Sequence, residues 1–164
     1  TLLVEGLIAA IHNNLGFALY NKSQLISAED PKEAMRLLDV AIIGYEKSLE
    51  LNKNDADTHN NLGVALYDKI RLISAKYPEE TMRLLDRSIS EYEEALKLNK
   101  NYADAYNNLG AALHFKSLLI SAEDPERAIR LLERAISECE KALELKDTNP
   151  YYVRCIIRLC SCFL

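Results

Sequence analysis

The stretch that decides the fold is His59-Asn60-Asn61-Leu62-Gly63, because it is the middle copy of a tract that occurs three times. The other copies are His12-Asn13-Asn14-Leu15-Gly16 and Tyr106-Asn107-Asn108-Leu109-Gly110, at a spacing of 47 residues, which Pro31, Pro78 and Pro125 also keep. Residues 9–55 and 103–149 are identical at 27 of 47 positions. A fixed period of this kind predicts a tandem array of structural units, here about 9–55, 56–102 and 103–149.

Each unit has the pattern of two helices joined by a short turn. In the third unit, apolar residues recur at helical spacing from Ala103 to about Ala122, and again after Pro125. Asp124 is a good N-cap, and Pro125 suits the first position of a helix. Core side chains are predicted on both helices: Leu109, Leu113, Leu119, Ile120, Ile129, Leu132, Ala135, Ile136, Cys139 and Leu143.

The predicted fold class is all-α. We expect a right-handed α-solenoid of three long antiparallel helical hairpins plus a C-terminal helix over residues 150–164, forming a single repeat domain over residues 1–164. The composition, with 49% hydrophobic and 27% charged residues, is that of an ordinary globular chain.

Charge and cysteine content limit the partners and the compartment. A net charge of −5 argues against nucleic acid, since a duplex binder needs clustered cations. No run of about 18 apolar residues is found, so membrane insertion is not expected. Three of the four cysteines, at 155, 160 and 162, crowd the last ten residues rather than forming a disulfide framework, which favours a reducing, cytoplasmic location.

With these residues in view, each unit resembles the tetratricopeptide repeat. The Leu-Gly pairs match its first helix. Its second helix is matched by small residues at Ala41, Ser88 and Ala135, and its aromatic site is occupied by Tyr45, Tyr92 and Cys139. The resemblance covers about residues 9–149 and is to a variant with 47-residue units and lengthened helices. Small residues facing each other let two helices approach closely.

The resemblance implies a protein-interaction module that binds an extended peptide in a concave groove lined by the first helix of each repeat. One stripe of each first helix differs from unit to unit and is called the variable stripe: Ala10, Phe17, Asn21 and Gln24; Asp57, Val64, Asp68 and Arg71; Asp104, Ala111, Phe115 and Leu118. Asn14, Asn61 and Asn108 recur at the edge of that stripe, and an amide can accept from and donate to one peptide unit. The alternative for these amides is that they cap or bridge neighbouring repeats. The predicted peptide-binding residues are Asn14, Asn61, Asn108, Phe17, Asn21, Val64, Asp68, Arg71, Phe115 and Leu118.

The charge of the stripe bears on the kind of peptide. Relatives that hold the acidic tails of heat-shock chaperones use a clamp of Lys, Arg and Asn, whereas this chain has Asn13, Asp104, Asn108 and Phe17 at those places. Carboxylates at Asp57, Asp68 and Asp104 would repel an acidic ligand. A neutral, apolar or basic peptide is therefore predicted.

Catalytic and metal-binding patterns were sought as well. His12 and His59 occupy the position on the first helix where the tetratricopeptide repeat has an aromatic residue, and each is expected to be half-buried with its ring nitrogens hydrogen-bonded. His114 is expected to face outward, away from other candidate residues. Convergent nucleophile and base residues are not found, and the cysteines between 155 and 162 lack paired C-x-x-C spacing. The sequence therefore predicts a non-enzymatic protein without a metal or cofactor.

A different class of function stays open beside the groove hypothesis. The chain could be a structural, self-assembling scaffold of designed or recently duplicated repeats, forming a homo-oligomer through its helix ends and its apolar C-terminal segment. The run Tyr151-Tyr152-Val153 and the end Phe163-Leu164 carry that alternative.

Overall fold

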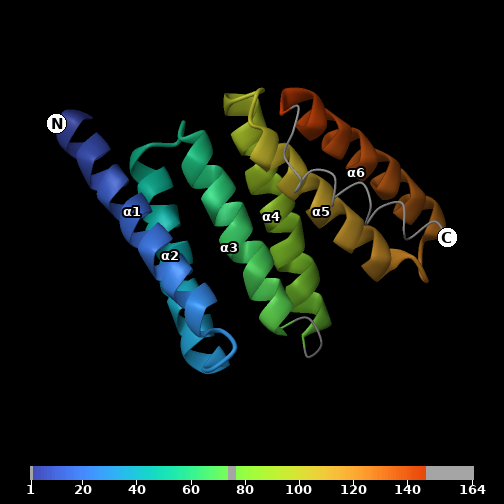
Figure 1. The fold of residues 1–164 in the computed structure, drawn as a ribbon, viewed down its shortest axis with the longest axis horizontal. Helices are drawn as coiled ribbons and strands as arrows, with labels where there is room; N and C mark the ends of the chain where they lie inside the picture. Colours follow the sequence, from blue (N-terminus) through green and yellow to red (C-terminus); the bar gives the residue numbers. More distant parts are fainter. Residues whose placement is uncertain (1, 74–76, 147–164) are drawn as a thin grey trace. The chain divides into compact units, whose positions relative to one another are not determined.

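The computed structural model describes residues 2–73 and 77–146, and within those ranges the regular structure is entirely helical. This confirms the all-α class and the three predicted helical hairpins. The predicted terminal helix over 150–164 lies outside the described residues. The helices are α1 (Leu2–Ile26), α2 (Pro31–Leu51), α3 (Ala56–Ile73), α4 (Pro78–Leu98), α5 (Ala103–Ile120) and α6 (Pro125–Leu145) (Figure 1).

The chain divides into two compact units, Thr1–Leu98 and Asn99–Leu164. In the first unit, α1 pairs with α2 and α3 pairs with α4 as antiparallel hairpins, and α2 packs against α3 (Figure 1). In the second unit, α5 pairs with α6. A single repeat domain over the whole chain therefore stays a prediction.

The second helices begin where the capping residues predict. The Asp30 carboxylate accepts a 3.0 Å hydrogen bond from the backbone N–H of Glu33, and Asp124 accepts one of 2.9 Å from Arg127. Each satisfies a backbone donor that the first turn of a helix leaves unpaired. Pro31 and Pro125 then start α2 and α6, as expected.

Within each hairpin the two helices touch through small residues. A Cβ atom added to Gly63 would lie 2.6 Å from the Tyr92 ring, and one added to Gly110 would lie 2.5 Å from the Cys139 sulfur. The Ser88 hydroxyl donates a 2.8 Å hydrogen bond to the Gly63 carbonyl across the same contact. The close approach predicted from the facing small residues is thereby confirmed.

Two predicted core residues are wrong. Leu119 is 40% exposed and Ile129 is 54% exposed, whereas Leu109, Leu113 and Ile120 are buried. Leu119 lies about 100° round the helix from the centre of the other three, so the predicted arc was too wide. Ile129 lies beside the buried seam of α6, which consists of the small residues Ala128, Ala135, Cys139 and Ala142.

Helix α1 differs from its counterparts in length and exposure. It begins at Leu2, seven residues before the first repeat was predicted to start, and its N-terminal end stands clear of the other helices of its unit (Figure 1). By length and composition alone, α1 could cross a membrane. A run of about 18 apolar residues does not occur in α1, because Glu5 and the polar tract from His12 to Asn14 interrupt it, so the expectation of no membrane insertion stays a prediction.

Candidate functional site

The first helices of the first unit display the predicted stripe to solvent. Asn14, Phe17 and Asn21 on α1 are exposed, and Asn61 and Val64 on α3 are half-buried. The stripes of α1 and α3 meet through hydrogen bonds between the two helices. The structure thus brings the α1 and α3 members of the site together.

The remaining members lie on α5, in the second unit. Asn108 and Phe115 are half-buried there, and Leu118 is 49% exposed. Phe115 and Asn108 both take part in contacts with other residues. Because the two units are described separately, these three residues extend the stripe only as a prediction.

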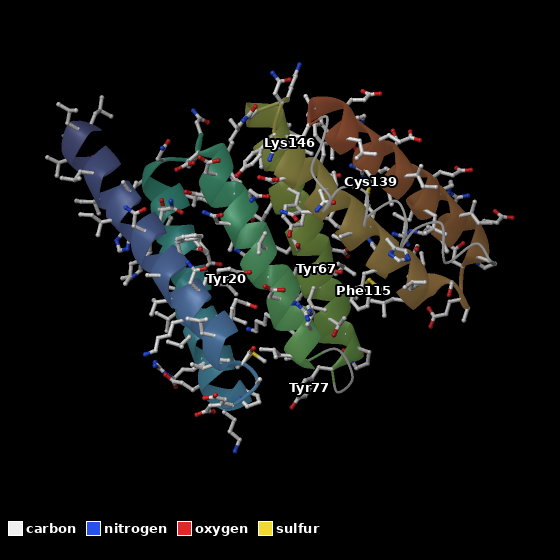
Figure 2. All side chains as sticks on the ribbon, viewed as in Figure 1. Tyr20, Tyr67, Tyr77, Phe115, Cys139 and Lys146 are labelled. Atoms are coloured by element: carbon white, nitrogen blue, oxygen red, sulfur yellow. The ribbon has the colours of Figure 1, made fainter. Side chains whose placement is uncertain are left out.

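Asp68 is the centre of a polar network between α1 and α3. One of its partners, Tyr20, is labelled on α1 in Figure 2. The Tyr20 hydroxyl donates a 2.7 Å hydrogen bond to Asp68 Oδ2, and Gln24 Nε2 donates one of 3.0 Å to the same oxygen. Arg71 Nη1 lies 3.5 Å from the other carboxylate oxygen, Oδ1. Burial, and then the neighbouring Asp68 carboxylate, raise the pKa of Tyr20. Two neutral donors and one cation of the same unit thus surround the Asp68 carboxylate.

A hollow of about 160 Å³ adjoins this network. It lies among three helices and is lined by Ser23, Gln24, Ser27, Ala34, Leu38, Asp68, Arg71 and Leu72. Its volume suits a single small side chain rather than a drug-sized ligand, for which pockets usually exceed about 300 Å³. The hollow therefore marks the end of the stripe and is no separate small-molecule site.

The asparagine row has an internal contact in the first unit. Asn61 Nδ2 donates a long, 3.5 Å hydrogen bond to Asn13 Oδ1 on the preceding first helix. This contact fits the alternative in which the recurring asparagines bridge neighbouring repeats, although a hydrogen bond of that length is weak. The Asn61 amide retains its carbonyl oxygen as an acceptor, and the Asn14 side chain is exposed.

His59 joins α3, α4 and the turn before α3. Its Nδ1 lies 2.7 Å from Glu91 Oε2, and its Nε2 lies 3.0 Å from the Lys53 carbonyl oxygen. The hydrogen bond to Glu91 raises the pKa of His59, against the opposing effect of partial burial. Both ring nitrogens face acceptors, so the charged imidazolium donates to both. The half-buried, satisfied imidazole predicted at this position is confirmed.

The remaining candidate groups are the metal-ligating side chains and the cysteines. In residues 2–73 and 77–146, groups of three or more His, Cys, Asp or Glu side chains able to hold a metal ion do not occur. Cys139 is buried, as predicted for a core residue, and it is disulfide-bonded. Cys155, Cys160 and Cys162 lie outside the described residues.

Two residues of the site, Tyr20 and Gln24, were not predicted from the sequence. Gln24 lies on the variable stripe, whereas Tyr20 recurs as Tyr67 in the second unit, and recurrence between units is typical of packing residues. Repetition marks packing, yet here the repeated tyrosine also reaches a groove residue. The contact between the Tyr20 hydroxyl and the Asp68 carboxylate of the next repeat can be recognised only when the two helices are seen packed together.

Comparison with known proteins agrees with this geometry. The family model for the TPR repeat matches residues 85–116, and no curated protein matches the chain. The TPR domain of Arabidopsis OM64 is similar in structure, with a TM-score of 0.67 at 17% identity, covering 96% of this chain and 98% of that one.

Two further solved structures are similar. The first TPR of Spaghetti (RPAP3) bound to the HSP90 peptide SRMEEVD has a TM-score of 0.58 at 19% identity, over 92% of this chain and 94% of its own. The first TPR domain of human RPAP3 has a TM-score of 0.57 at 20% identity, over 91% and 92%. The resemblance to the tetratricopeptide repeat family predicted from the sequence is therefore confirmed, by a matched repeat segment and by the fold.

Proposed function

We propose that the chain is a non-enzymatic protein-interaction module that binds an extended peptide along the stripe of its first helices. The observation that carries the proposal is the exposure of Asn14, Phe17 and Asn21 beside the half-buried Asn61. Amide and apolar side chains alternate there, which suits a peptide backbone with occasional apolar side chains. A similar domain holding the peptide SRMEEVD supports the choice of a peptide ligand.

The charge of the stripe favours a neutral, apolar or basic peptide. Asp57 is exposed, and Asp68 already accepts from Tyr20 and Gln24. On α1, the exposed stripe residues Asn14, Phe17 and Asn21 are uncharged. On α3, a ligand with several carboxylates would therefore meet one exposed cation, Arg71, whose ion-pair partner Asp68 would repel the ligand.

The test uses three fluorescent heptapeptides and anisotropy with the full chain. The probes are SRMEEVD, a neutral counterpart SRMQQVN and a basic counterpart SRMKKVK. We expect the acidic probe to bind at least about tenfold more weakly than the other two, since like-charge juxtaposition opposes binding. Equal or preferred binding of SRMEEVD would overturn the charge preference, and no binding of any probe would count against the groove.

The asparagine row is tested by a triple substitution, Asn14→Ala, Asn61→Ala and Asn108→Ala. Loss of binding with an unchanged helical circular dichroism spectrum is expected, because each amide holds one peptide unit. The matched control replaces two exposed asparagines in the turns between repeats, Asn54→Ala and Asn101→Ala, which should bind as the wild type does. Unchanged binding by the triple variant would refute the role of the amides.

A further inference from the structure

A second surface of the first unit lies on the outer side of α1. We call it the α1 apolar face. Its members recur at helical spacing and are all exposed: Val4, Leu7, Ile8, Ile11, Leu15 and Ala18. A continuous apolar surface on one helix is the kind that marks an interaction site.

The repeat shows what normally covers this face. At a spacing of 47 residues, Ile11 and Leu15 on α1 correspond to Thr58 and Leu62 on α3. Ile11 is 55% exposed and Leu15 is 52% exposed, whereas Thr58 and Leu62 are 0% and 1% exposed. Ala18 and its counterpart Ala65 differ in the same way.

On α3, this side is covered by α2, the second helix of the preceding hairpin. Leu62 borders a shallow hollow together with Glu46 and Leu49 of α2. The α1 apolar face is therefore the surface onto which a second helix packs in this repeat architecture. The same side chains that form a helix interface at α3 face solvent at α1.

A charged position points to the same kind of partner. Lys69 on α3 forms a 2.7 Å ion pair with Asp39 on α2. Its counterpart on α1 is Lys22, which is exposed and lies at the C-terminal part of the α1 apolar face. A helix that covered α1 as α2 covers α3 would bring a carboxylate to Lys22.

We propose that the α1 apolar face docks an amphipathic helix that residues 1–164 do not themselves supply, with an apolar stripe and an acidic side chain that pairs with Lys22. The helix reproduces the contact that α2 makes with α3. Asn14 borders this surface, whereas Phe17 and Asn21 lie farther round α1. The two proposals are tested separately because Leu15 and Lys22 belong to the α1 apolar face alone.

Two other occupants fit the face less well. Lys22 is the sole Lys or Arg in residues 2–26, whereas a helix that lies on anionic lipid carries several cations. A helix spanning a membrane would also have to leave α2 and break the buried 2.8 Å bond from Ser48 Oγ to the Ala9 carbonyl. Pairing of α1 with a second α1 brings no acid of the partner helix to Lys22, because Glu5 lies roughly 100° away round the helix.

The experiment uses a dye-labelled synthetic peptide of residues 31–51, the sequence of α2, and fluorescence anisotropy with the full chain. We expect saturable binding that weakens about tenfold or more in Leu15→Asp, since one buried leucine is lost to a charge. The matched control is Ile43→Asp, an apolar residue of α2 that is 48% exposed and lies off the α1 apolar face. It should bind the peptide as the wild type does.

A charge exchange identifies the register. Lys22→Glu should weaken binding of the wild-type peptide, and a peptide with Asp39→Lys should restore it. Binding without this rescue would overturn the proposed pairing. Two results would overturn the proposed occupant if the peptide also failed to bind. The first is concentration-dependent association of the chain in sedimentation velocity that Leu15→Asp abolishes. The second is co-sedimentation with vesicles containing phosphatidylserine that Leu15→Asp abolishes.

Discussion

The hydroxyl of Tyr20 lies 2.7 Å from the Asp68 carboxylate, so a side chain that faces the interior of one repeat is bonded to the stripe of the next. Asp68 also accepts from Gln24, and it would lose its shortest bond without the tyrosine. The contact ties two successive first helices together. The same hydrogen bond therefore contributes to the stability of the first unit and holds the Asp68 carboxylate in place at the predicted groove.

Tyr20→Phe removes this bond and keeps the ring. We expect the free energy of unfolding to fall by roughly 1 kcal/mol, the usual net value of such a bond, measured by urea denaturation. In the Asp68→Asn background the same change should cost less, because the charged acceptor is already gone. An equal cost in both backgrounds would show that the bond contributes nothing specific.

Gly63 and Gly6 make a matched pair for testing helix approach. A Cβ on Gly63 would lie 2.6 Å from the Tyr92 ring, while nothing lies within 4 Å of a Cβ on Gly6. Gly63→Ala should lower the free energy of unfolding by roughly 1–3 kcal/mol, because the hairpin must spread. Gly6→Ala should raise it by up to about 1 kcal/mol, because alanine favours a helix. A change of the same sign in the free energy of unfolding for both variants would contradict the close contact between Gly63 and the Tyr92 ring.

His59 should make stability depend on pH in one direction. Its pKa is raised above the usual value of about 6.5 by Glu91, so its contribution is fully present below that pH. The contribution is lost as pH rises through the pKa of the folded state, when the imidazolium gives up its proton. The Lys53 carbonyl and Glu91 then share one donor between them.

The measurement compares the wild type with His59→Gln by chemical denaturation between pH 5 and pH 9. The stability difference should be largest at the acidic end and shrink toward pH 9. Glu91→Gln should flatten the profile of the wild type in the same way, since the raised pKa depends mainly on that carboxylate. A difference that grew toward pH 9 would contradict the assigned charge state.

Repetition in the sequence shows which positions of the three units are equivalent, and this determines how much of the fold could be predicted. Three identical Leu-Gly tracts were enough to predict the hairpins and the contact between Gly63 and Ser88. Repetition could not show that Leu15 is exposed while Leu62 is buried, because the two residues are identical and only their neighbours differ. Burial at the first helix depends on what lies beside it in space.

The candidate site shows the same limit. Most stripe positions were recoverable because they vary between units while the core positions do not, and the asparagine row was recoverable because a polar residue recurs at the edge of that variable stripe. The partners of Asp68 were not, since Tyr20 and Gln24 come from a helix 44 to 48 residues earlier and their reach depends on the spacing of two helices. Asn61 likewise has its partner, Asn13, on another helix.

Thr81 offers the last test, because it is a buried polar group whose counterparts are apolar. Within residues 2–73 and 77–146, its hydroxyl oxygen has no hydrogen-bond partner, and the side chain is 1% exposed. The other repeats carry Ala34 and Ala128 at this position, both buried. Burying a hydroxyl without a partner costs roughly 1–3 kcal/mol, while the lost methyl group of threonine costs about 1 kcal/mol. Thr81→Ala should therefore leave the unfolding midpoint unchanged or raise it, and a loss above about 1 kcal/mol would mean that the hydroxyl is satisfied in solution.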